Sequence, residues 1–152
     1  SAVATIATHG KRVSPRLILK TQLPNQEPIP TQIIHLPNIK LKHNWVWHDV
    51  IHAMQEVISS KHGTGFHFGK NPGYTVAGKT GTAQIYGHSR SEYNVRKNLP
   101  KNLRNNELFI AFAPINNPKI AVAVIVEHDN NASGIARKVI DAYLHEQKHD
   151  IQ

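Results

Sequence analysis

The chain has 152 residues, enough for one ordinary domain or for part of a larger one. Lys and Arg number 18 against 10 Asp and Glu, which gives a formal net charge of +8, and 39% of the residues are hydrophobic, a composition that excludes wholesale disorder. The lack of cysteine excludes a disulfide scaffold, a thiolate nucleophile and any cysteine-based metal site.

The sequence indicates neither a membrane span nor a secretion signal. The longest unbroken apolar run, residues 120–126, is far shorter than the roughly 20 residues that cross a bilayer. Residues 1–4 lack the basic region and the long apolar stretch of a signal peptide. Because the chain also lacks an initiator Met and opens on an apparent helix end, we expect a piece of a longer protein whose targeting information lies upstream.

The first third of the chain predicts a short helix followed by a long irregular connection. Residues 2–8 are apolar and lead to Gly10, which predicts a helix that stops at a C′ glycine. Residues 13–21 carry an early proline and then β-prone side chains, so we expect extended chain there. Residues 22–44 hold four prolines among polar residues and predict an irregular surface connection.

A longer amphipathic helix is predicted next, with Asn44 as its N-cap. Its apolar residues recur at helical spacing and predict one broad buried face; they are Val46, Trp47, Val50, Ile51, Met54, Val57 and Ile58. The helix should end before Gly63 and Gly65, which mark a turn. Residues 73–86 are rich in β-branched and small side chains and predict a strand with glycine interruptions.

The second half predicts a basic loop, a hairpin and a closing helix. Residues 87–106 hold five Lys or Arg and one Glu, and we expect a solvated loop with a helical turn near its end. Strands at 108–115 and 119–127 flank Asn-Asn-Pro and predict a β-hairpin. Apolar residues at helical spacing predict the last helix; they are Ile135, Ala136, Val139, Ile140, Tyr143 and Leu144. The fold class is α+β, an antiparallel sheet of at least three strands with flanking helices.

The sharpest chemical motif is Lys79-Thr80-Gly81-Thr82 on the first of these strands. Side chains alternate along a strand, so Thr80 and Thr82 share a face and offer two hydroxyl donors that can bind a carboxylate. Gly81 removes a side chain between them and lets a substrate backbone lie against the strand edge. Lys79 adds a compact cation that favours anionic groups.

The motif and its context resemble the penicillin-binding transpeptidases and their relatives among the serine β-lactamases, in which K-T-G accompanies S-x-x-K and S-x-N. The resemblance is closest to the C-terminal part of the transpeptidase domain of the penicillin-binding protein 2 group, the elongation-class enzymes. Further matching segments carry it over nearly the whole chain; they are residues 73–84, Tyr93-Asn94, 109–114, 116–118 and 121–124.

The resemblance implies a serine D,D-transpeptidase that cross-links peptidoglycan stem peptides during elongation and is a β-lactam target. Thr80 and Thr82 would bind the carboxylate of a peptide ending in D-Ala-D-Ala, and the Thr82 N–H would donate to the oxyanion. Lys79 would orient hydrogen bonds near the nucleophile as a catalytic residue without being the acylation base. No metal or organic cofactor is implied.

The sequence departs from the family pattern at its serines. No serine of the chain is followed by Lys three positions later or by Asn two positions later. We therefore expect residues 1–152 to be the C-terminal portion of one transpeptidase domain, without the S-x-x-K and S-x-N portion. Such a chain should neither cross-link peptidoglycan nor be acylated by penicillin on its own.

The resemblance also implies a location and a partner for the parent protein. It would be held in the inner membrane by an N-terminal helix upstream of this chain and would face the periplasm. It would work beside a membrane-embedded glycosyltransferase of the RodA type. The missing nucleophile leaves open another function, that of a non-catalytic interaction module, since a fragment without a nucleophile could still fold and dock.

Three other patterns suggest different chemistry. His48 and His52 stand four apart with Asp49 between them, an imitation of the H-E-x-x-H zinc motif that lacks a third ligand. Residues 63–65 resemble a phosphate loop but lack the following Gly-Lys-Ser/Thr, so a simple turn is preferred. The basic loop 88–104 makes a module that binds nucleic acid or another anionic polymer the alternative function, although Tyr93 is its lone aromatic residue.

Overall fold

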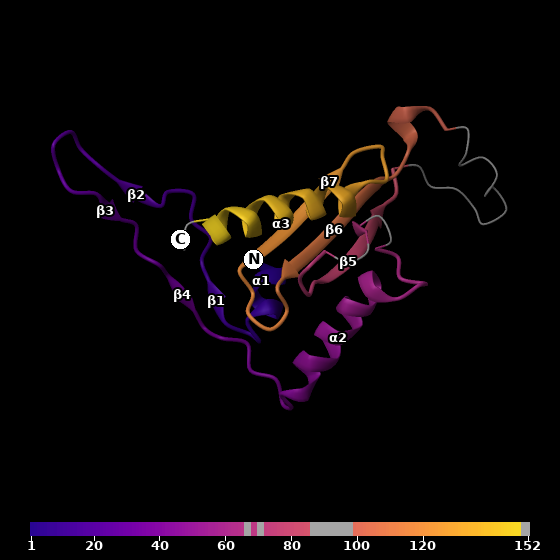
Figure 1. Ribbon diagram of the computed structural model, residues 1–152, viewed down its shortest axis with the longest axis horizontal. Helices are drawn as coiled ribbons and strands as arrows, with labels where there is room; N and C mark the ends of the chain where they lie inside the picture. The colour runs from indigo at the N-terminus through magenta and orange to yellow at the C-terminus, as the bar shows by residue number, and fades with distance from the viewer. Residues whose placement is uncertain (66–67, 70–71, 86–98, 150–152) are drawn as a thin grey trace.

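A three-stranded antiparallel sheet with helices on both faces forms the body of the molecule (Figure 1). The computed structural model describes residues 1–65, 68–69, 72–85 and 99–149, with side chains described up to residue 146. In chain order the elements are α1 (Ala2–Ala7), β1 (Arg12–Val13), β2 (Lys20–Thr21), β3 (Ile29–Pro30), β4 (His35–Leu36), α2 (Trp45–Ser59), β5 (Ala77–Ala83), the short 3-10 helix Lys101–Leu103, β6 (Asn106–Ala113), β7 (Ile120–Val126) and α3 (Ala132–His149).

The sheet has the strand order β5-β6-β7, with β6 in the centre. β6 and β7 form the predicted hairpin, in register from Glu107 opposite Val126 to Ala113 opposite Ile120. β5 is shorter than the predicted strand 73–86, because Gly73 adopts a positive φ of 78° and the chain bends there before the strand begins. The 3-10 helix confirms the predicted helical turn at the end of the basic loop.

Two buried clusters hold the helices on opposite faces of the sheet. On one face α3 packs on β6 and β7, and the cluster there includes Phe109, Ala111, Ala136 and Ile140. On the other face α1 and α2 supply Val3, Ala7, Ile51 and Met54 to a cluster around Ala77 and Phe112. β6 contributes to both clusters, since successive side chains of a strand point to opposite faces. The predicted α+β architecture is confirmed.

Residues 12–36 form an arm that extends away from the sheet (Figure 1). β1 pairs with β4 and β2 pairs with β3, each over two residues and antiparallel. The predictions of extended chain at 13–21 and an irregular connection at 22–44 are therefore right for most residues, but they miss these ladders. Two-residue pairings carry no alternating apolar pattern that a sequence could reveal.

Both predicted helix caps need correction. The helix ends at the C-cap Thr8, and the C′ residue with left-handed backbone is His9, with φ of 52°, followed by Gly10 with φ of 94°. His9 N–H donates to the Ile6 carbonyl and Gly10 N–H to the Thr5 carbonyl, the two bonds of a Schellman motif. Asn44 precedes α2 but makes no side-chain capping bond, because its own backbone is already helical.

The buried faces of α2 and α3 are narrower than predicted. Val50 of α2 is exposed, whereas Ile51 and Met54 are buried as expected. Of the apolar residues predicted to face inward on α3, Ile135, Val139 and Tyr143 are exposed. Ala136 and Ile140 are buried as predicted, and the small residues Ala132 and Ser133 are buried as well, because they let the helix approach the sheet closely and leave the larger side chains on its flank.

Candidate functional site

β5 lies at an edge of the sheet in the described part of the chain. Its seven residues pair with β6 alone, from Ala77 opposite Phe112 to Ala83 opposite Asn106. An edge strand presents a row of backbone N–H and C=O groups that can pair with an added peptide. The sequence-predicted residues Lys79, Thr80, Gly81 and Thr82 occupy the middle and end of this edge strand.

Thr80 and Thr82 point to the face of the sheet that α3 covers. Thr80 lies opposite Phe109, which is buried against α3, and Thr82 lies opposite Glu107. Glu107 accepts the Ala132 N–H at the start of α3 at 2.8 Å. Lys79 and Gly81 point to the other face, so the four residues of the motif present hydroxyls on one face and a cation on the other.

The Lys79 ammonium folds back onto its own strand. Its Nζ donates to the Thr80 carbonyl at 2.7 Å, and the side chain is exposed. The Thr80 hydroxyl lies 2.7 Å from the Thr64 hydroxyl, which comes from the turn after α2. The sequence predicts the turn at 63–65 but not this contact, because the contact joins residues sixteen positions apart.

The glycines of β5 differ in the space around them. A Cβ on Gly78 would meet the Phe109 Cζ at 2.7 Å and the Ile58 Cδ1 at 3.0 Å, so this position is filled by its neighbours. A Cβ on Gly81 would meet only Leu108, at 3.3 Å from its Cβ. Gly78 is therefore required by packing more strongly than Gly81.

A cavity of about 380 Å³ opens where β5 ends. It is lined by Thr82, Leu99, Arg104, Asn105, Asn106, Glu107, His128, Asp129 and Asn130. Its wall is braced by hydrogen bonds from the His128 N–H to Asn106 Oδ1 at 3.0 Å and between His128 Nδ1 and the Arg104 carbonyl at 3.2 Å. Charged groups of both signs, from Arg104, Glu107 and Asp129, thus line the same cavity as the exposed Thr82 side chain.

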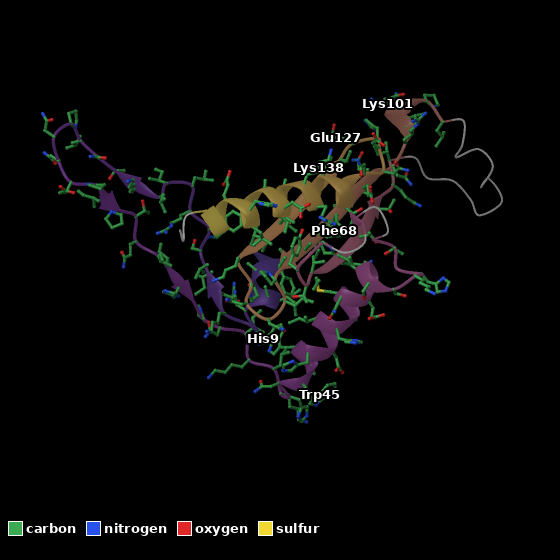
Figure 2. The ribbon with its side chains drawn as sticks, viewed as in Figure 1. His9, Trp45, Phe68, Lys101, Glu127 and Lys138 are labelled. Atoms are coloured by element: carbon green, nitrogen blue, oxygen red, sulfur yellow. The ribbon has the colours of Figure 1, made fainter. Side chains whose placement is uncertain are left out.

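A polar cluster ties α3 to the segment that enters β5, and no sequence pattern predicted it. The Tyr74 hydroxyl donates to Asp141 Oδ1 at 2.8 Å, and Arg137 Nε donates to Asp141 Oδ2 at 2.6 Å. The Arg137 guanidinium also lies 5.6 Å from the centre of the ring of Phe68, which is labelled in Figure 2. Burial and the hydrogen bond to Asp141 raise the pKa of Tyr74 above its usual value.

The other patterns of the sequence are not brought together into sites. His48 and His52 lie on the exposed side of α2, where the His48 ring contacts His9. In the described ranges, no three side chains of the metal-binding types gather to hold an ion, and no helix there has the length and apolar character for crossing a bilayer. Most of the basic loop 88–104, including Tyr93-Asn94, lies outside the described residues.

Comparison with protein families places the chain among known proteins. A family model described as "Penicillin binding protein transpeptidase domain" matches residues 1–144. The peptidoglycan D,D-transpeptidase MrdA of Haemophilus influenzae is 32% identical over 150 residues, which cover 96% of this chain and 23% of MrdA. MrdA of Acinetobacter baumannii is 33% identical over 149 residues, which cover 94% and 21%.

Solved structures agree with the sequence comparisons. Pseudomonas aeruginosa PBP2, solved in complex with WCK 5153, has a TM-score of 0.67 at 33% identity and is matched over 93% of this chain and 28% of its own. Penicillin-binding protein A from Mycobacterium tuberculosis, solved as an imipenem acyl-enzyme, has a TM-score of 0.68 at 29% identity, over 93% and 29%. The chain spans about a quarter of the length of these relatives. It belongs to the penicillin-binding protein transpeptidase family.

Proposed function

We propose that this chain supplies the substrate-binding strand of a serine D,D-transpeptidase that cross-links peptidoglycan stem peptides during cell elongation and is inhibited by β-lactams. The observation that carries the proposal is that the Lys-Thr-Gly-Thr motif lies on an edge strand with one side unpaired in the described structure. A peptide ending in D-Ala-D-Ala can add to such an edge through its backbone.

The side chains of β5 suit the anionic end of that peptide. The hydroxyls of Thr80 and Thr82 lie on one face and donate to the terminal carboxylate, while the Lys79 cation lowers the cost of bringing negative charge to the strand. Because Thr82 is exposed and borders the cavity at the end of β5, the carboxylate has room beside it.

The backbone of β5 suits the oxyanion of acyl transfer. Backbone groups of residues two apart point to the same side of a strand, so the Thr82 N–H lies on the same side as the Thr80 carbonyl. The Lys79 ammonium donates to the Thr80 carbonyl. This contact supports the placement of that carbonyl, and with it the Thr82 N–H, on the open side of β5. A preorganised N–H donor of this kind contributes about 2.7–4 kcal/mol of transition-state stabilisation.

The covalent steps of the reaction need catalytic groups from outside the Lys-Thr-Gly-Thr strand, above all a nucleophilic serine. A serine hydroxyl attacks the carbonyl of the penultimate D-Ala, the terminal D-Ala leaves, and the amine of a neighbouring stem attacks the resulting ester. None of the chain's serines has the S-x-x-K or S-x-N spacing. We propose that residues 1–152 are the C-terminal portion of the transpeptidase domain and that the nucleophile belongs to another segment.

Binding to the isolated chain tests the substrate assignment. NMR titration of the ¹⁵N-labelled chain with N-acetyl-D-Ala-D-Ala should shift the amide signals of Lys79 to Thr82, with N-acetyl-L-Ala-L-Ala as the control ligand. Lys79→Ala should weaken this binding, and the matched variant Lys20→Ala on the arm should leave it unchanged. Equal shifts with both ligands, or shifts away from β5, would contradict the proposal.

Labelling with a fluorescent penicillin tests the division of the site. After denaturing electrophoresis the isolated chain should show no labelled band, because no serine stands in the nucleophile pattern. A covalently labelled band would show that the chain holds a complete site.

The cellular setting follows from the same resemblance. We propose that the parent protein is anchored in the inner membrane by a helix outside residues 1–152, faces the periplasm, and works beside a RodA-type glycosyltransferase. The names of the MrdA relatives, as peptidoglycan transpeptidases, support the setting in cell-wall synthesis. Fractionation of cells that produce the parent protein should recover it with the inner membrane.

A further inference from the structure

We propose that Thr64 is a positioning residue for the carboxylate site: it donates its proton to Thr80 Oγ1 and so directs the Thr80 proton toward the ligand. The inference rests on the proposed function and adds a residue from outside the Lys-Thr-Gly-Thr strand. The observation behind it is the 2.7 Å distance between Thr64 Oγ1 and Thr80 Oγ1, the usual length of a hydroxyl–hydroxyl hydrogen bond.

The proton count of the pair carries the argument. Each threonine hydroxyl has one proton to donate and two lone pairs to accept with. If Thr80 donates to Thr64, its proton is used and its oxygen turns lone pairs toward a bound carboxylate, which can only accept. If Thr64 donates to Thr80, the Thr80 proton is free to point at the carboxylate. An anionic ligand therefore selects the arrangement in which Thr64 is the donor.

The turn that carries Thr64 is fixed from both sides. Gly65 N–H donates to the Val57 carbonyl at 2.9 Å, and Gly63 N–H donates to the Ser60 carbonyl at 3.1 Å. A Cβ on Gly63 would stand 2.2 Å from the Val57 carbonyl oxygen, so the turn lies directly on the end of α2. Because α2 packs along β5, the Thr64 hydroxyl is held at a set distance from the strand.

This arrangement predicts a preference for ligands with a charged end. A carboxylate needs the Thr80 proton, and a charge-assisted hydrogen bond is about twice as strong as a neutral one. A C-terminal amide offers a weaker acceptor together with its own donors, so it gains less from the orientation of Thr80. The bond from Thr64 also fixes the Thr80 hydroxyl in this orientation and makes it a stronger donor, because hydrogen bonds in a chain polarise one another. Removal of the Thr64 hydroxyl should therefore weaken binding of the acid more than binding of the amide.

The test compares three forms of the chain with two ligands. Dissociation constants for N-acetyl-D-Ala-D-Ala and its C-terminal amide are measured by NMR titration of the wild type, Thr64→Val and Thr64→Ser. Thr64→Val should bind the acid about fivefold more weakly and the amide nearly as well as the wild type does, and Thr64→Ser should restore the acid. Thr21→Val, an exposed threonine on the arm, is the matched control and should change neither constant.

Every result of these titrations either supports or overturns the positioning role of Thr64. Equal binding of the acid by Thr64→Val and the wild type, an equal loss for acid and amide, or no rescue by Thr64→Ser would overturn the role of Thr64. The β5 amide shifts of each variant without ligand are first compared with those of the wild type, so that a displaced turn is recognised. If the turn of Thr64→Val is displaced, the result for Thr64→Ser decides. If the wild type binds neither ligand, the proposed function itself fails, and the inference fails with it.

Discussion

Two glycines of one strand, Gly78 and Gly81, respond differently to the same added methyl group. At Gly78 the Cβ would meet Phe109 at 2.7 Å and the Ile110 carbonyl at 3.0 Å, and a buried ring and a backbone group yield little. We expect Gly78→Ala to lower the free energy of unfolding by about 1–3 kcal/mol, measured by urea denaturation. Gly81→Ala, with one contact at 3.3 Å, is the control and should change it by less than about 1 kcal/mol. Equal losses would contradict the packing argument.

Removal of a buried hydroxyl near the start of α3 should stabilise the chain. Ser133 is 1% exposed, and its Oγ has no hydrogen-bond partner in the described structure. A buried polar group without a partner costs about 1–3 kcal/mol. Ser133→Ala should therefore raise the free energy of unfolding by about 1 kcal/mol.

Thermal and urea unfolding check this gain against a second helical serine. Ser59→Ala is the comparison, because that hydroxyl is exposed and donates to the Gln55 carbonyl at 3.2 Å. Its removal should change stability by only a few tenths of a kcal/mol. A clear loss of stability in Ser133→Ala would mean that the hydroxyl has a partner.

At the scale of elements, the link between α3 and the segment that enters β5 makes stability depend on pH. The pKa of Tyr74 is raised by burial and by its bond to Asp141, so the folded chain retains the phenol proton at a pH where the unfolded chain loses it. The stabilisation is complete below about pH 10 and declines as pH rises above it. Tyr74→Phe lacks this titration.

Unfolding experiments between pH 9 and 11.5 isolate the effect of Tyr74. The difference in free energy of unfolding between the wild type and Tyr74→Phe should shrink or reverse as pH rises, because only the wild type has this proton to retain. Tyr143→Phe, on the exposed flank of α3, serves as the control. Parallel curves for the wild type and Tyr74→Phe would rule out the linkage.

The elements with strong local patterns were predictable from sequence, and their packing partners were not. The hairpin of β6 and β7 follows from β-branched runs around Asn-Asn-Pro, and the Lys-Thr-Gly-Thr strand follows from its composition. The contact between Thr64 and Thr80 depends on how α2 docks along β5. The hydrogen bonds that Asp141 accepts from Tyr74 and Arg137 depend on how α3 crosses the sheet, which no local spacing encodes.

At the scale of the whole molecule, the arm at 12–36 is separate from the core. Neither buried cluster of the described structure contains an arm residue, and Leu17, Ile18 and Leu19 are exposed. Val13 and His35 pair directly, so a two-residue Asn-Gly turn can replace residues 14–34. We expect this deletion to change the melting temperature by less than about 4 °C.

Sedimentation and thermal unfolding check the deletion together. The shortened chain should also associate less at high concentration, because seven exposed large apolar side chains are removed from the surface. The control is an arm of full length with Leu17→Ser, Ile18→Ser and Leu19→Ser. Loss of cooperative unfolding in the shortened chain would place the arm within the folding unit.

The crowding around Gly78 also limits how the strand can change over evolutionary time. A side chain at Gly78 would collide with Phe109 and Ile58, so substitutions at this position should be rejected whatever ligand the chain binds. Ala83, at the exposed end of the same strand, has no such restriction from burial. Natural variants of this chain should therefore diversify at Ala83 while Gly78 stays fixed, and larger side chains in this strand should first arise at its exposed end.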